Sequence, residues 1–409
     1  MLSDAEPELQ LVVECVRVAV DSGADPDVGA LVASDLDWDR VLDLARYHGV
    51  LQLLQQGLAS TCREVSADPR VPPAISSRLD GTVQRRTMRN LAATDELRGI
   101  LDDFDAAGVR ALPFKGPVLS AFAYDSVTVR EYNDLDFLVH PADVSTAADV
   151  LEERGYEWRD GAPRLDDAAL LGGPVTKPVV HEYEMTGPDI DVELRWRVGD
   201  AERPFSPAVP ALWDHREQVD VGGASLPALA PADRLLVLAF HGTKHRWFLL
   251  KWLCDFVAAM DATTADWDRV LAHARDHGGE RPLLVGAALA ERVFEYDLPG
   301  PVAERVREAT GVTGPAERVV RSLASGAMSA PGRIESARFF AAASESPAAL
   351  PRLVALHSAL HPTYADYRFC PLPGKLHPLY YVIWPVRLLA ELLGRPNRTE
   401  TDGPTEEPT

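Results

Sequence analysis

The sequence contains few lysines, and its excess charge is strongly acidic. Of its 41 basic residues five are lysine, which leaves 36 arginines, against 62 acidic residues and a formal net charge of −21 over 409 residues. Such a chain is not expected to bind nucleic acid through its overall field, because contacts with phosphates need a basic surface. Any site for a phosphorylated ligand must therefore be a local positive pocket or carry its own metal ions.

Cysteine is also scarce, and long apolar runs are absent. The four cysteines lie far apart, at Cys15, Cys62, Cys254 and Cys370, and form neither a disulfide framework nor a zinc pair. No stretch of about 18 uncharged apolar residues occurs, so we expect no transmembrane helix. Residues 1–6 lack the basic and apolar regions of a signal peptide, and a reduced cytoplasm is the expected location.

The rest of the composition is that of an ordinary globular protein, with a hydrophobic fraction of 46% and a charged fraction of 25%. Apolar residues recur with helical periodicity from residue 1 to about 100, where the longest expected helix covers Ser76–Ala107. The same periodicity returns from Pro231 onward and predicts helices over Ala232–Trp247, over Leu249–Met260 and through residues 266–360.

Strand signals occur only in the middle of the chain. The apolar segments Val109–Phe114 and Leu135–Val139 predict two strands, and each is followed by an expected helix. A hairpin is expected from residues 179–186 and 189–198, around Gly187-Pro188. The second arm of this hairpin alternates apolar and polar residues with a period of two, which is typical of a half-buried strand.

These elements predict an α+β fold with a small mixed sheet flanked by helices. The sheet core is expected over 96–225, between an N-terminal helical region over 1–95 and a C-terminal helical domain over 226–395. Residues 396–409 are polar and rich in Pro, Thr and Glu, which predicts a disordered tail.

Asp134 and Asp136 are the first candidates for chemistry, because residues two apart on a strand point to the same face. Two carboxylates held side by side repel each other, and burying them unpaired is costly. A divalent cation resolves this conflict. Mg²⁺ prefers oxygen ligands, often one or two carboxylates together with the phosphates of a substrate. Two such ions can bind both the attacking and the leaving oxygen of a phosphoryl displacement.

A third carboxylate is expected from a neighbouring strand, and the second arm of the hairpin offers two. Asp191 and Glu193 share one face of that arm. We favour Glu193, which stands in the middle of the alternation, with Asp191 as a close alternative. Both also fit the solvated face of an antiparallel hairpin, beside Arg195 and Arg197.

Phosphate contacts are expected just upstream of the aspartates. Lys115-Gly116 lies at a strand-to-helix turn, where Gly116 lets the backbone approach a phosphate and the next helix offers free N–H groups. Lys115 adds a point charge for a triphosphate. Arg130 is a second candidate for the same phosphates, although it could instead pair with Glu131 or Asp134.

These motifs together resemble an uncharacterised nucleotidyltransferase family of bacteria and archaea, within the DNA polymerase β-like nucleotidyltransferase superfamily. The resemblance rests on Leu112-Pro113-Phe114-Lys115-Gly116, Tyr124, Arg130 and Asn133-Asp134-Leu135-Asp136-Phe137-Leu138-Val139. It extends to Leu44–Val50, to the strand Val192–Trp196 and to the helical stretches His241–Trp247 and Leu250–Asp255, so it covers about residues 40 to 260. The motif departs from the family where Arg195 replaces a histidine, and from the wider superfamily where Lys115-Gly116 replaces a Gly-Ser turn.

The resemblance implies a metal-dependent transferase that moves a nucleoside monophosphate from an NTP to an acceptor and releases pyrophosphate. Asp134 and Asp136 would hold two Mg²⁺ ions, with Mn²⁺ as a substitute, and Glu193 or Asp191 would complete the metal site. The acceptor is open: a small molecule or a protein side chain fits better than a large nucleic acid. The alternative is a catalytically inactive relative that binds a nucleotide or a partner.

Several residues near the end of the resemblance have two interpretations. Lys244 and Lys251 are seven residues apart and share one helix face if the helix is continuous. They would line the triphosphate path or would simply be solvated. His241 and His245 are four residues apart, a spacing that can bind zinc, but no third ligand is evident. A core or capping role is therefore favoured for the two histidines. Asp255 is expected to pair with a nearby lysine or arginine.

The last feature is an apolar stretch over 380–393 that is interrupted by Pro385. Packing onto the helical core is the expected role. A peripheral membrane contact is the alternative, although only Arg387 and Arg395 are basic nearby.

Overall fold

The computed structural model describes residues 5–21, 28–64, 71–159, 182–198, 209–329, 332–343 and 379–394, with a few single residues between these ranges. The N-terminal helices are α1 (Pro7–Val20), α2 (Val28–Val32), α3 (Trp38–Tyr47), α4 (Leu51–Glu64) and α5 (Pro73–Ala106). The helical periodicity seen in the sequence is confirmed in this region, and α5 begins three residues before the expected helix. The predicted tail over 396–409 lies outside the described residues.

The middle of the chain contains the strands and the short elements between them. They are β1 (Ala111–Pro113), α6 (Gly116–Tyr124), β2 (Asp134–Val139), the 3-10 helix η1 (Pro141–Asp143), α7 (Val144–Glu153), β3 (Glu157–Trp158), β4 (Glu182–Thr186), β5 (Asp191–Arg195), α9 (Val209–Asp214), β6 (Glu217–Val221) and β7 (Ala224–Ala228). Both expected apolar strands and the expected hairpin are present. The expected residues 179–181 of that hairpin are not among the described ones.

Helices make up the described part of the chain after β7. They are α10 (Pro231–Lys244), α11 (Leu250–Asp261), α12 (Trp267–Asp276), α13 (Glu280–Phe294), α14 (Gly300–Glu308), α15 (Thr313–Ala324), α16 (Arg333–Ala343) and α19 (Tyr380–Gly394). The α+β class predicted from the sequence is confirmed. In the described part of the chain, no helix is long and apolar enough to cross a membrane.

The main sheet has five strands in the order β1-β2-β5-β4-β3. β2 pairs in parallel with β5, and the other pairings are antiparallel, so the sheet is mixed as expected. The alternation seen in the sequence is reproduced by burial, because Ile190, Val192, Leu194 and Trp196 are all buried. The face that carries them packs on α5 and α7 through a core that also includes Leu97, Phe104 and Phe137.

The hairpin of β6 and β7 was not predicted, although its sequence carries a signal. Gly222-Gly223 separates two runs of alternating residues, and both glycines have positive φ, of 58° and 87°. This combination is typical of a two-residue hairpin turn. Arg98 of α5 donates to the backbone carbonyls of Val221 and Gly222, which fixes the hairpin against α5.

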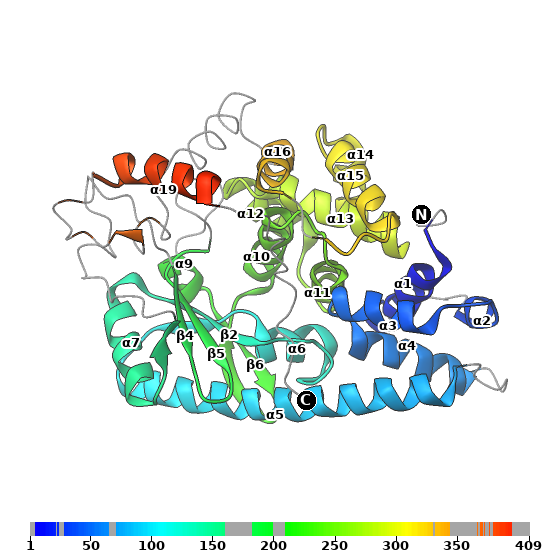
Figure 1. Cartoon of the computed structure of the whole chain (residues 1–409), viewed down its shortest axis with the longest axis horizontal. Coiled ribbons are helices and arrows are strands. Elements are labelled where there is room, and N and C mark those ends of the chain that lie inside the picture. The colour runs from blue at the N-terminus through cyan, green and yellow to red at the C-terminus, as the bar shows by residue number, and fades with distance from the viewer. Residues whose placement is uncertain are drawn as a thin grey trace.

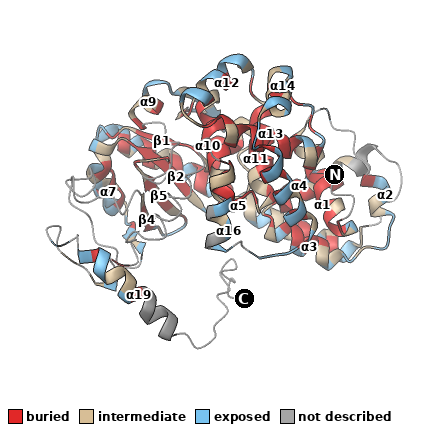
Figure 2. Ribbon diagram, turned by 90° about the horizontal axis from the view of Figure 1, so that it is seen from above, coloured by how far each residue is buried: buried red, intermediate tan, exposed pale blue. Residues whose placement is uncertain are grey.

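The N-terminal and C-terminal helices share one apolar core rather than forming two separate ones. Buried residues of α1, α3, α4, α10, α11 and α13 belong to a single cluster, and Figure 2 shows buried residues, in red, along these helices. Figure 1 shows α5 running beneath both the sheet and this helical body. The predicted domain boundaries at 95/96 and 225/226 remain predictions, and they fall inside α5 and β7.

The expected packing of the apolar stretch at 380–393 is wrong for the first turns of α19. Tyr381, Val382 and Val386 are exposed, whereas Tyr380 and Arg387 are buried, and Arg387 pairs with Asp366. Side chains after Arg387 lie outside the described residues. Pro385 lies inside this helix.

Candidate functional site

The site is built on the pairing of β2 with β5. The parallel register places Asp134 opposite Asp191 and Asp136 opposite Glu193. Asp136 is buried and Asp134 is half-buried. The remaining residues of β2 are buried and apolar, so the polar side chains of this strand are confined to its first residues. The structure therefore brings all four predicted carboxylates onto one face: Asp134, Asp136, Asp191 and Glu193.

Two protein cations contact Asp136. Lys115 Nζ lies 3.2 Å from Asp136 Oδ1, and Arg195 Nε lies 3.9 Å from the same oxygen. Burial by itself would raise the pKa of Asp136, but the charges of Lys115 and Arg195 outweigh it and lower the pKa. For Asp134, burial and then the charge of Asp136 raise the pKa. The two aspartates thus have different electrostatic surroundings although they are only two residues apart.

Glu193 is held by Arg195 on the same strand. Arg195 Nη2 lies 2.5 Å from Glu193 Oε2 and 2.8 Å from Glu182 Oε2. Burial and the neighbouring charge of Asp136 raise the pKa of Glu193 to about 7, although Arg195 acts in the opposite direction. Glu193 is therefore one member of a buried network and not part of a solvated hairpin face.

Asp191 faces the same side of the sheet but has other partners. Its carboxylate pairs with Arg159, which also contacts Glu184 at 2.7 Å. The Asp191 side chain is 33% exposed, against 18% for Glu193. Of the two candidates for the third carboxylate, Glu193 is the one that the register places beside Asp136.

Lys115 and Gly116 lie where β1 leads into α6. Gly116 begins the helix with a φ of +55°, a conformation that other residues adopt only with strain. A Cβ at this position would lie 3.7 Å from the carbonyl oxygen of Asp134, which is an ordinary contact. The positive φ, and not lack of space, is therefore what requires glycine here. The turn brings the start of α6 and the ammonium group of Lys115 next to the aspartates.

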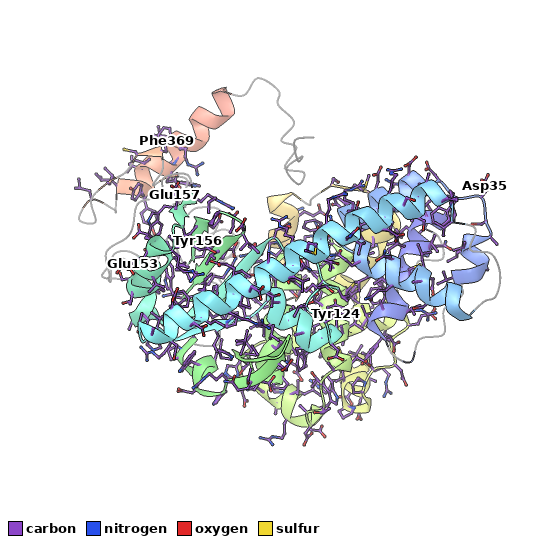
Figure 3. All side chains as sticks on the ribbon, turned by 90° about the horizontal axis from the view of Figure 1, so that it is seen from below. Asp35, Tyr124, Glu153, Tyr156, Glu157 and Phe369 are labelled. Atoms are coloured by element: carbon purple, nitrogen blue, oxygen red, sulfur yellow. The ribbon has the colours of Figure 1, made fainter. Side chains whose placement is uncertain are left out.

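Arg130 is anchored from the helical domain and not by its expected partners. Its Nε lies 2.9 Å from both carboxylate oxygens of Asp255 on α11, and Tyr124 donates its hydroxyl to Asp255 at 3.0 Å. Pairing with Glu131 or Asp134 was therefore wrong, and the expectation that Asp255 pairs with a basic residue is confirmed. Figure 3 shows Tyr124 near the centre of the molecule.

The terminal amino groups of Arg130 make no hydrogen bond to any of the residues that the structure describes. Burial raises the pKa of Asp134, and the charge of Arg130 acts in the opposite direction. Asp255 therefore fixes the inner nitrogen of Arg130 and leaves the two outer ones available near the aspartates.

Lys251 reaches the site because His48 fixes the start of α11. The backbone N–H of Leu250 donates to His48 Nδ1 at 3.3 Å, and that of Lys251 donates to the His48 carbonyl at 3.2 Å. Next to it, a Cβ on Gly49 would lie 2.8 Å from Lys251 Cδ. The charge of Lys251 lowers the pKa of Asp134. The segment around His48, far away in the sequence, thus helps to position a cation near the carboxylates.

Lys244 and Lys251 lie on two separate helices, so the condition under which they would share one helix face is not met. α10 ends at Lys244, and the turn to α11 passes through Arg246 and Trp247, which both have positive φ. Lys244 is half-buried in the last turn of α10, and its charge helps to lower the pKa of His241. The charge that α11 supplies to the pKa of Asp134 is that of Lys251.

His241 and His245 belong to a cluster of rings around Trp252. The ring centroids of His241 and His245 lie 5.5 and 4.9 Å from that of Trp252, and the ring of Phe248 lies 4.8 Å away. Burial, followed by the charge of Lys115, lowers the pKa of His241 well below its ordinary value. The imidazole of His241 is therefore neutral. The core role expected for this pair is consistent with these ring contacts.

In the described ranges, no three His, Cys, Asp or Glu side chains are arranged so that they could hold a metal ion. The carboxylates that do fit are the Asp134–Asp136 pair, since Mg²⁺ is commonly bound through one or two carboxylates and completes its shell with water and substrate phosphates. Glu193, the expected third ligand, already binds Arg195.

Comparison with family models now identifies the chain. Residues 34–295 match the model of a family described as uncharacterised nucleotidyltransferase. The chain belongs to this family. The match covers all elements from α3 to α13, including the β2–β5 pair and the α10–α11 turn, and it confirms the resemblance seen in the sequence. Nucleotidyl transfer is thus the general activity of this protein, and Asp134 and Asp136 lie inside the matched region. Comparison with the curated proteins finds no match.

Some residues of this nucleotidyltransferase site were not singled out from the sequence. Glu182 enters the network only because β4 places it opposite Arg195. Tyr124 and His48 were noticed in motifs without a role, and the structure gives each a polar contact with α11. Tyr124 and His48 could have been selected as site residues because they lie inside those motifs. No sequence pattern marked Glu182 as a site residue.

One consequence of the His48 contact is a dependence of stability on pH. Burial, followed by the charge of Arg40, lowers the pKa of His48 from its ordinary value of 6.5 to about 4. The neutral imidazole accepts a hydrogen bond from the backbone N–H of Leu250. The unfolded chain then binds more protons than the folded one below pH 6.5, so stability is present above that pH and is lost as the pH falls towards 4. The shift corresponds to about 3 kcal/mol.

This expectation can be measured by urea unfolding at several pH values between 7 and 4.5. The His48→Gln variant should have a lower stability at pH 7 and a flatter dependence on pH than the wild type. His215→Gln, which changes an exposed histidine, is the control and should follow the wild type. Parallel curves for wild type and His48→Gln would contradict the assignment.

Proposed function

We propose that this chain transfers a nucleoside monophosphate from an NTP to an acceptor at the Asp134–Asp136 end of β2. The observation that carries the proposal is the parallel register that sets Asp136 opposite Glu193, with Lys115 and Arg195 both near the same oxygen of Asp136. Carboxylates and fixed cations lie together at this end of β2. Such an arrangement can bind and stabilise the charge of a phosphoryl group during its transfer.

In this proposal Asp134 and Asp136 hold Mg²⁺. When bound, the ion neutralises the phosphate charge and orients the triphosphate. The β- and γ-phosphates are bound by three groups: Lys115 after β1, the first turn of α6, and the outer amino groups of Arg130 in the loop before β2. Lys251 and Lys244 add positive charge from the α10–α11 side.

The chemical step is a displacement at the α-phosphorus. A lone pair of the acceptor oxygen or nitrogen forms the new bond, the bond from the α-phosphorus to the α,β-bridging oxygen breaks, and pyrophosphate leaves with that electron pair. The acceptor's proton passes to Glu193, which lies across the strand pair from Asp136. The chain contributes mainly positioning and charge neutralisation.

The acceptor is proposed to be a small molecule or a protein side chain. A large nucleic acid fits less well, because the net charge of −21 repels it. The cytoplasm is proposed as the place of action.

The proposal is tested with NTPs labelled at either the α- or the γ-phosphate, added with Mg²⁺ and a metabolite or protein extract. Nucleotidyl transfer places the α-label on an acceptor and the γ-label in pyrophosphate. A γ-label on the acceptor would instead show phosphoryl transfer and overturn the proposal. Calorimetric binding of an NTP without any turnover would support the alternative of an inactive, nucleotide-binding relative.

The choice between Glu193 and Asp191 gives a paired prediction. Glu193→Gln should lower the rate of transfer about a hundredfold, because the residue that receives the proton is lost. Asp191→Asn on the same face should change the rate less than about threefold, since Asp191 is paired with Arg159 outside the Asp136 network. Initial rates of pyrophosphate release give both values. The reverse ranking of the two variants would assign the role to Asp191.

A further inference from the structure

Arg195 lies among the acidic side chains of the site and contacts three of them. It stands opposite Glu182 in the β4–β5 register and two residues after Glu193. Its guanidinium contacts three carboxylates: Glu193 at 2.5 Å, Glu182 at 2.8 Å and Asp136 at 3.9 Å. The side chain is only 13% exposed. Arginine keeps its charge at every pH at which a protein folds, so this position holds a permanent cation.

A second divalent cation would need the same carboxylates. In two-ion sites the ions are about 3.5–4 Å apart, and a shared carboxylate helps to hold both. Mg²⁺ also requires its ligand oxygens at about 2.0–2.1 Å in a nearly octahedral arrangement. Arg195 binds Glu193 through Oε2 alone. An ion held by Asp136 and the other Glu193 oxygen would therefore lie next to the guanidinium of Arg195, and the two positive charges would repel each other.

Lys115 adds a second positive charge at Asp136 and strengthens this limit. Its ammonium group lies 3.2 Å from the Asp136 oxygen that also faces Arg195. Asp136 thus has two protein cations at one oxygen, whereas no protein cation lies within 4.0 Å of the Asp134 carboxylate in the described part of the chain. The position open to a divalent ion is on the Asp134 side of the pair.

We propose that Arg195 takes the place of a second divalent cation, so that this nucleotidyltransferase binds one divalent ion per chain, at Asp134 and Asp136. This inference rests on the proposed function and sharpens it: the two ions expected from the sequence are reduced to one, and a fixed guanidinium supplies the remaining positive charge. Glu193 is then a partner of Arg195 and not a metal ligand.

The inference is tested by counting bound Mn²⁺ with electron paramagnetic resonance and equilibrium dialysis. The whole chain is measured with Mn²⁺ alone and with Mn²⁺ plus each of the four α,β-methylene nucleoside triphosphates, which cannot release pyrophosphate. The wild type should hold one Mn²⁺ per chain. Arg195→Gln, which frees Glu193, should hold two, and Arg195→Lys, which keeps the charge, should hold one.

Two Mn²⁺ ions in the wild type would overturn the inference, as would none, or a single ion in Arg195→Gln. The wild-type count decides the matter even if Arg195→Gln does not fold, which thermal unfolding would show. Failure of all four analogues to bind would count against the proposed function. A wild-type count of two with the analogue bound would instead leave the proposed function intact and remove only the single-ion site.

Discussion

Replacing Asp136 by asparagine is expected to lower the rate of nucleotidyl transfer by about a thousandfold, because it removes the carboxylate on which the cations of the site converge. Asp136 is the most buried of the four candidate carboxylates Asp134, Asp136, Asp191 and Glu193, and it contacts both Lys115 and Arg195. Asparagine has almost the same shape but carries no charge to bind a divalent ion. The loss should therefore appear in kcat and in Mn²⁺ affinity.

The rate is measured as Mg²⁺-dependent pyrophosphate release under saturating NTP. Asp143→Asn is a suitable control, since Asp143 follows the same strand but pairs with Arg110 at the surface. This control should keep its rate within about a factor of two, as expected for a surface ion pair. Full activity of Asp136→Asn would refute the proposed site, whatever its effect on stability.

Replacing Asp255 by alanine is expected to lower the free energy of unfolding by about 3–5 kcal/mol, because it leaves the buried guanidinium of Arg130 without its partner. The side chains of Arg130 and Asp255 are 10% and 3% exposed, so water replaces little of the lost interaction. Tyr124 loses a partner as well, since its hydroxyl donates to Asp255. Urea unfolding, read from the midpoint and the slope, gives the change.

A double variant separates the structural role of this pair from its role in binding. Arg130→Met with Asp255→Leu removes both charges and should recover most of the stability, because a buried ion pair can often be replaced by apolar residues without loss. It should not recover triphosphate binding, because the outer amino groups of Arg130 are gone. A double variant that binds NTP as the wild type does would show that Arg130 does not touch the phosphates.

Tyr124→Phe is the mild member of this series and isolates the hydrogen bond to Asp255. It should cost about 1 kcal/mol, the usual value for one intramolecular hydrogen bond. Its NTP affinity should remain close to that of the wild type, since Asp255 still holds Arg130 by two contacts at 2.9 Å. A large loss of affinity in Tyr124→Phe would mean that the hydroxyl itself faces the ligand.

Local patterns in the sequence were enough to define the elements around the site. A period of two predicted the strand that carries Glu193, and the spacing of Asp134 and Asp136 placed both on one face, because these regularities depend on a few neighbouring residues. The turn at Lys115-Gly116 and the helix after it followed from the same kind of reasoning. The family was also visible in the sequence, since its motifs are short and local.

Contacts between distant segments were decided by the tertiary structure alone. Arg130 pairs with Asp255, which is 125 residues away in the sequence, and the backbone N–H of Leu250 donates to His48, which is 202 residues away. Two nearer carboxylates, Glu131 and Asp134, were plausible partners for Arg130 on sequence grounds. The path of α11 across α6 brings Asp255 to Arg130 instead, and no local pattern encodes that path.

The sequence by itself determined the strand, the paired aspartates on one face of it and the membership of a nucleotidyltransferase family. It left open which carboxylate stands beside Asp136 and which cation balances it. The parallel register of β2 and β5 decided for Glu193, and the antiparallel register with β4 set Arg195 between Glu193 and Glu182. The physical reason is that a register shift of one residue turns every side chain to the other face, so only the assembled sheet fixes which charges meet.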